Sequence, residues 1–196
     1  MEQMKRVASA FFILPPLLLL LNYAPPWLFL CLTLGIMWQS LREYFHILQP
    51  MQLPVSSVLC STLVSSLVIV TASLADGYWL PMVLFLSLVC LTISALVTTS
   101  PASAPFLILL ASIFGVFFIG WGLSHLILLR YLPAGKWYIL FLCAVVWAGD
   151  TSAMYAGKSL GRHKLAPTIS PGKTWEGAAA GVVGGILAAL LSAAWG

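Results

Sequence analysis

Charged residues are scarce in this sequence. Asp, Glu, Lys and Arg make up only 7% of its 196 residues, and the acids number five. An ordinary soluble domain is about 25% charged and about 45–50% apolar. Here 61% of the residues are hydrophobic, and the mean hydropathy is +1.04. The composition therefore excludes an ordinary soluble domain and indicates an integral membrane protein with several spans.

The cysteine spacing and the placement of the basic residues further narrow the class of protein. No Cys-x-x-Cys pair occurs, and isolated cysteines in apolar runs generally act as small buried hydrophobic residues, so we expect neither a disulfide nor a metal site from them. The net charge of +4 comes from basic residues that cluster at the ends of apolar runs, which is typical of membrane orientation and does not suggest nucleic-acid binding. The four cysteines are Cys31, Cys60, Cys90 and Cys143.

The apolar runs predict an all-α bundle of seven transmembrane helices. A span needs about 20 predominantly apolar residues, and proline-rich or Asp-Gly breaks separate the runs. We expect one transmembrane domain over residues 1–196, with a cytoplasmic polar loop over residues 157–174. The expected spans cover residues 7–23, 27–48, 55–75, 79–98, 106–129, 137–156 and 175–195.

The first of these runs has a second interpretation. Lys5 and Arg6 followed by apolar residues are also typical of a signal peptide, but Pro25-Pro26 makes a poor cleavage site, which favours a retained span. With the amino terminus in the cytoplasm, seven cations lie at cytoplasmic ends and two, Arg130 and Lys136, at the opposite ends. The positive-inside rule supports that orientation, and the plain architecture suits a bacterial plasma membrane.

The stretch from Asp150 to Gly177 carries most of the residues that could do chemistry. A membrane protein keeps such a polar cluster where water, a partner or a substrate stabilises it. The alternative interpretation is a basic segment that only binds anionic lipid headgroups at the membrane surface. The titratable residues of the stretch are Asp150, Lys158, Arg162, His163, Lys164, Lys173 and Glu176.

Asp150 is the acid in the predicted sixth span. It stands six residues before the expected end of that span, roughly 9 Å deep, where an aspartate costs about 2.5–3.5 kcal/mol. A structural pairing with one basic residue is one interpretation. A metal site in a wet cleft is the other, because Thr151, Ser152 and Tyr155 add hydroxyl groups on the next turn. Carboxylates, hydroxyls and water suit Mg²⁺.

The start of the last span resembles a phosphate-binding arrangement. Ser170 followed by Pro171 predicts a helix N-cap with proline in the first turn. Free N–H groups at such an end favour phosphate, and Lys173 and Thr174 would add a charge and a hydroxyl. A P-loop is excluded, because Pro167 stands where that motif needs glycine.

Four other residues or patterns leave alternatives open. Glu176 could make a favourable helix-dipole contact, contact Lys173 or join a metal site. His163 could contact phosphate or be a plain loop residue, and Arg42 and Glu43 could form a local ion pair. The glycines spaced four apart in the last span (Gly177, Gly181 and Gly185) predict close helix packing, with room for a lipid chain as the alternative.

Taken together, the motifs of this stretch resemble the phosphatidate cytidylyltransferases (CDP-diacylglycerol synthases). The resemblance implies a polytopic enzyme that uses Mg²⁺, with a possible second cation, to join CTP and phosphatidic acid into CDP-diacylglycerol and pyrophosphate. Membrane lipids would be its surroundings and a homodimer one arrangement. The segments that carry the resemblance are Asp150–Ala153, Gly157-Lys158, Gly161–Pro167, Ile169–Pro171 and Lys173–Gly177.

The resemblance also implies roles for individual residues. It points to Asp150, Lys164, Lys173 and Glu176 as catalytic residues, with Asp150 as the metal ligand. The substrate-binding set would be Lys158, Arg162, His163, Ser170 and Thr174.

One feature of that family has no counterpart in these residues. The family carries a further acid-rich segment nearer its carboxyl end, thought to hold the metal, and this sequence contains no second acidic cluster. We therefore expect a fragment or a shortened relative, and weak or no CTP turnover by these 196 residues alone. The alternatives are a related CTP-dependent lipid kinase or cytidylyltransferase, or a non-catalytic module that binds anionic lipid.

Overall fold

The computed structural model describes residues 19–20, 23, 25–74, 77–97 and 105–193. The chain separates into two compact units, Met1–Pro133 and Ala134–Gly196. Nearly all of the expected first span, residues 7–23, lies outside the described residues. From residue 26 on, helices occupy the expected ranges to within a few residues.

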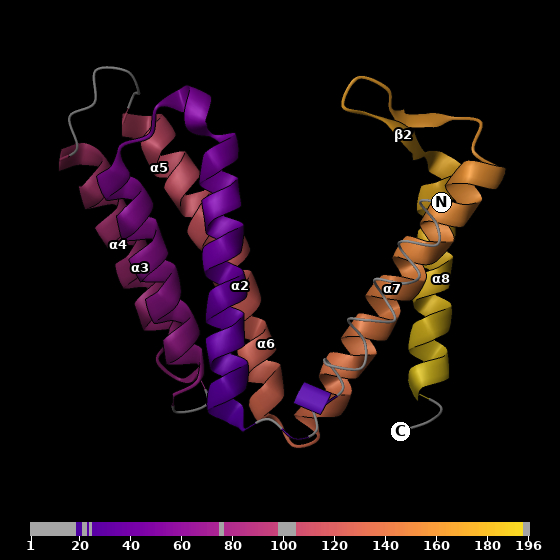
Figure 1. Cartoon of the computed structure of the whole chain (residues 1–196), viewed down its shortest axis with the longest axis horizontal. Coiled ribbons are helices and arrows are strands. Elements are labelled where there is room, and N and C mark those ends of the chain that lie inside the picture. The colour runs from indigo at the N-terminus through magenta and orange to yellow at the C-terminus, as the bar shows by residue number, and fades with distance from the viewer. Residues whose placement is uncertain (1–18, 21–22, 24, 75–76, 98–104, 194–196) are drawn as a thin grey trace. The chain divides into compact units, whose positions relative to one another are not determined.

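The first unit is a helical bundle (Figure 1). Pro25 and Pro26 open its first long helix, where a missing N–H group costs nothing. One apolar stretch, residues 105–131, runs through three consecutive helical elements with a π-helical turn in the middle. The elements are α2 (Pro26–Ile47), η1 (Gln49–Met51), α3 (Val55–Ala72), α4 (Leu80–Val97), α5 (Pro105–Phe114), the π-helix η3 (Gly115–Trp121) and α6 (Gly122–Tyr131).

Helix α3 holds this bundle together. It contacts α2, α4, α5, η3 and α6, and it buries serines as well as valines. The Ser61 hydroxyl donates to the Ser57 carbonyl at 2.8 Å, so this polar group is satisfied inside its own helix. Between helices, Trp38 Nε1 donates to Ser66 Oγ at 3.0 Å, which ties α2 to α3.

The apolar helices confirm an all-α polytopic membrane protein. Among the residues that the structure describes, five helical stretches have the length and hydropathy to cross a bilayer: α3, α4, residues 105–131, α7 (Gly135–Ser159) and α8 (Trp175–Ala193). Helix α2, an expected span, is not among them. Large apolar side chains such as Leu63 and Phe118 point outward and are 70% exposed, as lipid-facing residues are. The count of seven spans and the cytoplasmic amino terminus stay predictions.

The second unit is an antiparallel helix pair joined by a β-hairpin. Helices α7 and α8 run side by side, and the hairpin of β1 (Lys164–Ala166) and β2 (Ser170–Thr174) lies at one end of the pair (Figure 1). The strands pair antiparallel, with Lys164 opposite Thr174 and Ala166 opposite Ser170. The expected loop over 157–174 is thus more ordered than predicted: α7 continues to Ser159, and most of the rest is a hairpin.

Candidate functional site in the second unit

Glycines bring α7 and α8 into backbone contact. A Cβ atom added to Gly181 would lie 3.0 Å from the Ala153 Cβ and 3.3 Å from the Gly149 carbonyl oxygen. One added to Gly177 would lie 2.8 Å from the Ala153 carbonyl oxygen and 3.1 Å from the Gly157 Cα. The small-residue spacing of α8 therefore serves packing. Its counterpart on α7, Gly149-Ala153-Gly157, has the same four-residue spacing and could have been found in the sequence.

This contact also bears on two earlier predictions. The α8 glycines face α7 of the same chain, so their spacing gives no support to a homodimer. A Cβ on Gly184 would overlap the Ser152 side chain. Ser152, predicted to add a hydroxyl beside Asp150, is therefore packed against α8.

Thr174 is the buried residue where the hairpin meets α8. It is 4% exposed, and its hydroxyl accepts a hydrogen bond from the Gly177 N–H at 3.1 Å. This is an N-cap on the first turn of α8. Gly161 must be glycine here, because a Cβ would lie 2.7 Å from Thr174 Cγ2 and overlap the Gly157 carbonyl oxygen.

The predicted helix start at Ser170 is wrong. Ser170 and Pro171 belong to β2, and the helix begins at Trp175. A proline is tolerated in this two-stranded ribbon because each strand is an edge strand, while Thr174 supplies the cap. The Trp175 N–H donates to the His163 carbonyl at 3.0 Å, and the Gly177 N–H is also occupied. The helix end therefore does not present these donors to phosphate.

His163 and Glu176 meet at the junction of hairpin and helix. His163 Nδ1 lies 2.6 Å from Glu176 Oε1, and the His163 backbone N–H lies 3.2 and 3.3 Å from the two carboxylate oxygens. Since a carboxylate only accepts, Nδ1 carries the proton of this bond. The side chains are 79% and 27% exposed. No pattern in the sequence indicated this pair, and Glu176 contacts His163 in place of the suggested Lys173.

The four cations of this region are exposed. Lys158 ends α7, Arg162 precedes β1, Lys164 lies in β1 and Lys173 in β2. Among the described residues, no hydrogen bond or ion pair to their side chains is found. Thus the end of the helix pair presents free positive charge to its surroundings. That arrangement can bind phosphate groups.

Asp150 lies apart from this cluster along the helix axis. It stands nine residues before Ser159, where α7 ends, so it is about 14 Å from that end at the helical rise. This is deeper than expected, because α7 continues past the predicted boundary. The Asp150 side chain is exposed. Within the described residues, no three His, Cys, Asp or Glu side chains gather closely enough to hold a metal ion.

These features define a class: a polytopic membrane protein with a cationic hairpin at the end of a glycine-packed helix pair. The sequence belongs to the cytidylyltransferase family, whose model matches residues 4–195. Members of this family generally use divalent cations. The described residues offer Asp150 as an exposed carboxylate, whereas Glu176 is bonded to His163. The described residues are therefore compatible with a divalent cation that takes most of its ligands from other groups. They do not form a complete metal site themselves.

Several curated relatives are named phosphatidate cytidylyltransferase. The chain is 49% identical over 90 residues to the phosphatidate cytidylyltransferase of Brucella abortus biovar 1 (strain 9-941), which covers 42% of this chain and 33% of that protein. It is 46% identical over 67 residues to that of Bacillus subtilis (strain 168), covering 34% and 25%. Over 59 residues it is 44% identical to that of Haemophilus influenzae, covering 30% and 19%. The matches thus span a third or less of these relatives. No solved structure matches this chain.

Proposed function

We propose that this chain acts in CTP:phosphatidate cytidylyltransfer, which makes CDP-diacylglycerol and pyrophosphate for phospholipid biosynthesis. The phosphatidate oxygen would attack the α-phosphorus of CTP, the bond to the β-phosphate would break, and pyrophosphate would leave. Family membership and the names of the relatives support this reaction. The observation that carries it is the set of exposed cations on one hairpin at the end of two apolar helices, since two polyanions must be neutralised to react.

In this proposal the two hairpin lysines contact different phosphate groups. Lys164 lies opposite Thr174, and Lys173 immediately precedes Thr174. The pairing has a register shift between Lys164 and Ala166, which interrupts the regular alternation of side chains along the two strands. The two lysines come from different strands, and in this proposal one contacts the nucleotide and the other the lipid phosphate. Lys158 and Arg162 add charge at the base of the hairpin, and Ser170 contributes a hydroxyl.

Two of the predicted site residues act through their neighbours in this proposal. Glu176 holds His163 and the start of β1, so it positions the hairpin and leaves the exposed His163 ring facing substrate. Thr174 keeps α8 capped while its side chain stays buried. Substrate is then bound by the lysines, Arg162 and His163, which lie at the surface.

We propose Mg²⁺ as the divalent cation, with Asp150 as a ligand. Mg²⁺ is commonly held by one or two carboxylates together with substrate phosphates and water, and when bound it would supply positive charge to the phosphates. Asp150→Asn should abolish CTP turnover while leaving binding to anionic vesicles unchanged. Full CTP turnover by this variant would contradict the assignment of Asp150 as a metal ligand.

We further propose that the protein lies in the bacterial cell membrane as a multi-pass protein with the hairpin in the cytoplasm, where CTP is found. The bacterial relatives and the apolar helices support this location. A thiol-reactive reagent that cannot cross the membrane should label a cysteine placed at Gly172 only after the cells are opened. Labelling in intact cells would contradict it.

The test of the proposed reaction uses the protein purified from its own membrane. Given labelled CTP and phosphatidic acid, it should form labelled CDP-diacylglycerol, identified by its headgroup. In a parallel assay with polyprenol and CTP labelled at its γ-phosphate, a labelled polyprenol phosphate would instead indicate a related lipid kinase. No product, with retained binding to anionic vesicles, would indicate the non-catalytic lipid-binding module, which the exposed hairpin cations also support.

A further inference from the structure

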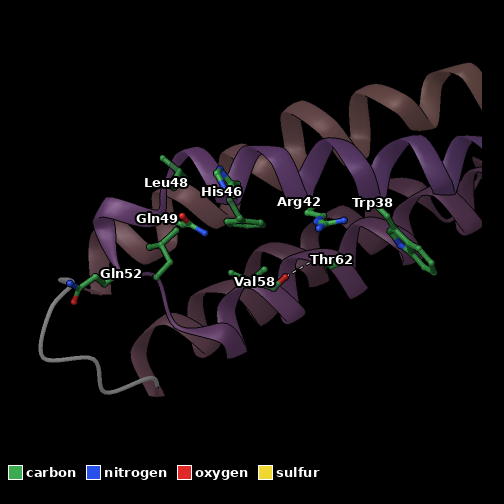
Figure 2. Close-up of a pocket in the computed structure, with 10 residues that line it drawn as sticks. Trp38, Arg42, His46, Leu48, Gln49, Gln52, Val58 and Thr62 are labelled. Atoms are coloured by element: carbon green, nitrogen blue, oxygen red, sulfur yellow. Dashed lines mark hydrogen bonds between the residues drawn. The ribbon is translucent and has the colours of Figure 1, made fainter.

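The first unit contains a pocket that the proposed reaction does not use. It lies between the last turns of α2, η1 and the first half of α3, and its volume is about 660 Å³. Figure 2 shows Arg42 between the two helices, with Trp38 on one side of it and His46 and Gln49 on the other. Every residue that lines the pocket belongs to the first unit.

Arg42 gives this pocket a positive charge. Arg42 and His46 are one helical turn apart on α2, which places them on the same side of the helix. The suggested ion pair between Arg42 and Glu43 is not formed. Glu43 instead accepts a hydrogen bond from Gln39 Nε2 at 2.7 Å. No described residue forms an ion pair with Arg42.

The remaining lining separates polar groups from apolar ones. Gln49 and Gln52 carry amide donors, and Phe45, Leu53 and Val58 form apolar wall. The Thr62 hydroxyl donates to the Val58 carbonyl at 2.8 Å, so it offers no donor to a ligand. Next to Val58 and Thr62 in the sequence of α3, Leu59 and Leu63 are 57% and 70% exposed. The pocket thus suits a molecule with a compact anionic end and a long apolar one.

We propose that this pocket binds the phosphate-bearing headgroup of an anionic membrane phospholipid, with its acyl chains along α2 and α3. Basic pockets between transmembrane helices are known to hold such headgroups. The Trp38 Nε1 bond to Ser66 keeps α2 and α3 at a fixed spacing beside the pocket. Inorganic phosphate would gain nothing from the apolar wall. The site depends on the first unit alone and stands whether or not the chain turns over CTP.

The experiment uses the full chain in phosphatidylcholine vesicles that contain a small share of photoactivatable phosphatidylglycerol. After illumination, peptides of α2 and α3 should carry the probe. Arg42→Gln should lower that labelling about fivefold, since one basic side chain near the membrane surface contributes about that much to anionic-lipid binding. His46→Gln should lower it as well and serves as a second variant if Arg42→Gln does not fold.

Two controls separate charge from general damage. Glu43→Gln removes a neighbouring acid and should leave labelling unchanged or raise it, and Arg130→Gln removes a cation of the same unit outside the pocket and should leave labelling unchanged. The proposal is overturned by equal labelling of wild type and both pocket variants, or by equal labelling from photoactivatable phosphatidylcholine. It is also overturned if inorganic phosphate or CTP displaces the lipid probe.

Discussion

The Glu176 carboxylate binds both the ring and the backbone of His163. Oε1 lies 2.6 Å from Nδ1, and both carboxylate oxygens lie within 3.3 Å of the His163 amide nitrogen. One side chain in the first turn of α8 thereby fixes the point where the hairpin begins. The geometry of the exposed cations depends on this contact, because Arg162 and Lys164 flank His163 in the chain.

Replacing Glu176 should loosen the hairpin without unfolding the helix pair. In Glu176→Gln the neutral amide binds the His163 N–H and ring more weakly, since bonds to charged groups are the stronger ones. We expect faster amide hydrogen exchange at His163 and unchanged exchange in the middle of α7. Glu43→Gln, which removes an acid bonded to the Gln39 amide, is the matched control. Unchanged exchange at His163 would mean that the contact does not hold the hairpin.

Thr174 offers a cap that can be removed and restored. Thr174→Ala deletes the hydroxyl that accepts from Gly177 N and should cost about 1 kcal/mol of stability, as such caps do. Thr174→Ser keeps an oxygen at the same place and should retain most of that stability. The thermal unfolding midpoint in detergent measures both. Equal loss in the serine variant would assign the effect to the missing methyl group and its packing.

Two hairpin glycines provide a steric comparison. Gly161→Ala would push a methyl group against the Gly157 carbonyl and the Thr174 side chain, and overpacking of this kind costs about 1–3 kcal/mol. Gly172 has no atom within 4 Å of an added Cβ, so Gly172→Ala should leave the unfolding midpoint nearly unchanged. Equal unfolding midpoints of the two variants would mean that the close packing of Gly161 against Thr174 is not present in solution.

The two hairpin lysines should affect different substrates. If they contact different phosphate groups, as proposed, Lys164→Gln and Lys173→Gln should each raise the KM of one substrate, and not the same one. About 1.4 kcal/mol of lost phosphate contact would give a tenfold change. Initial rates of the native protein with CTP and phosphatidic acid varied in turn give both constants. A rise in the same KM in both variants would place the lysines on one phosphate group.

The sequence determined the class of structure and the place of the polar stretch. In lipid, the backbone N–H and C=O groups of a long apolar run find hydrogen-bond partners within a helix. The helices from residue 26 on could therefore be located from the sequence. The glycine spacing of α8 likewise predicted close packing, because a missing side chain is visible in the sequence itself.

Only the tertiary structure decided how that polar stretch is arranged. Ser170-Pro171 and Thr174 are both plausible helix starts in the sequence, and strand pairing between Lys164 and Thr174 selects the second. The bond between His163 and Glu176 joins residues thirteen positions apart, and the hairpin that brings them together has no periodic signal. The charge of the Arg42 pocket also depends on tertiary structure. Sequence spacing allows Glu43 to bond either Gln39 or Arg42, and the side-chain geometry selects Gln39.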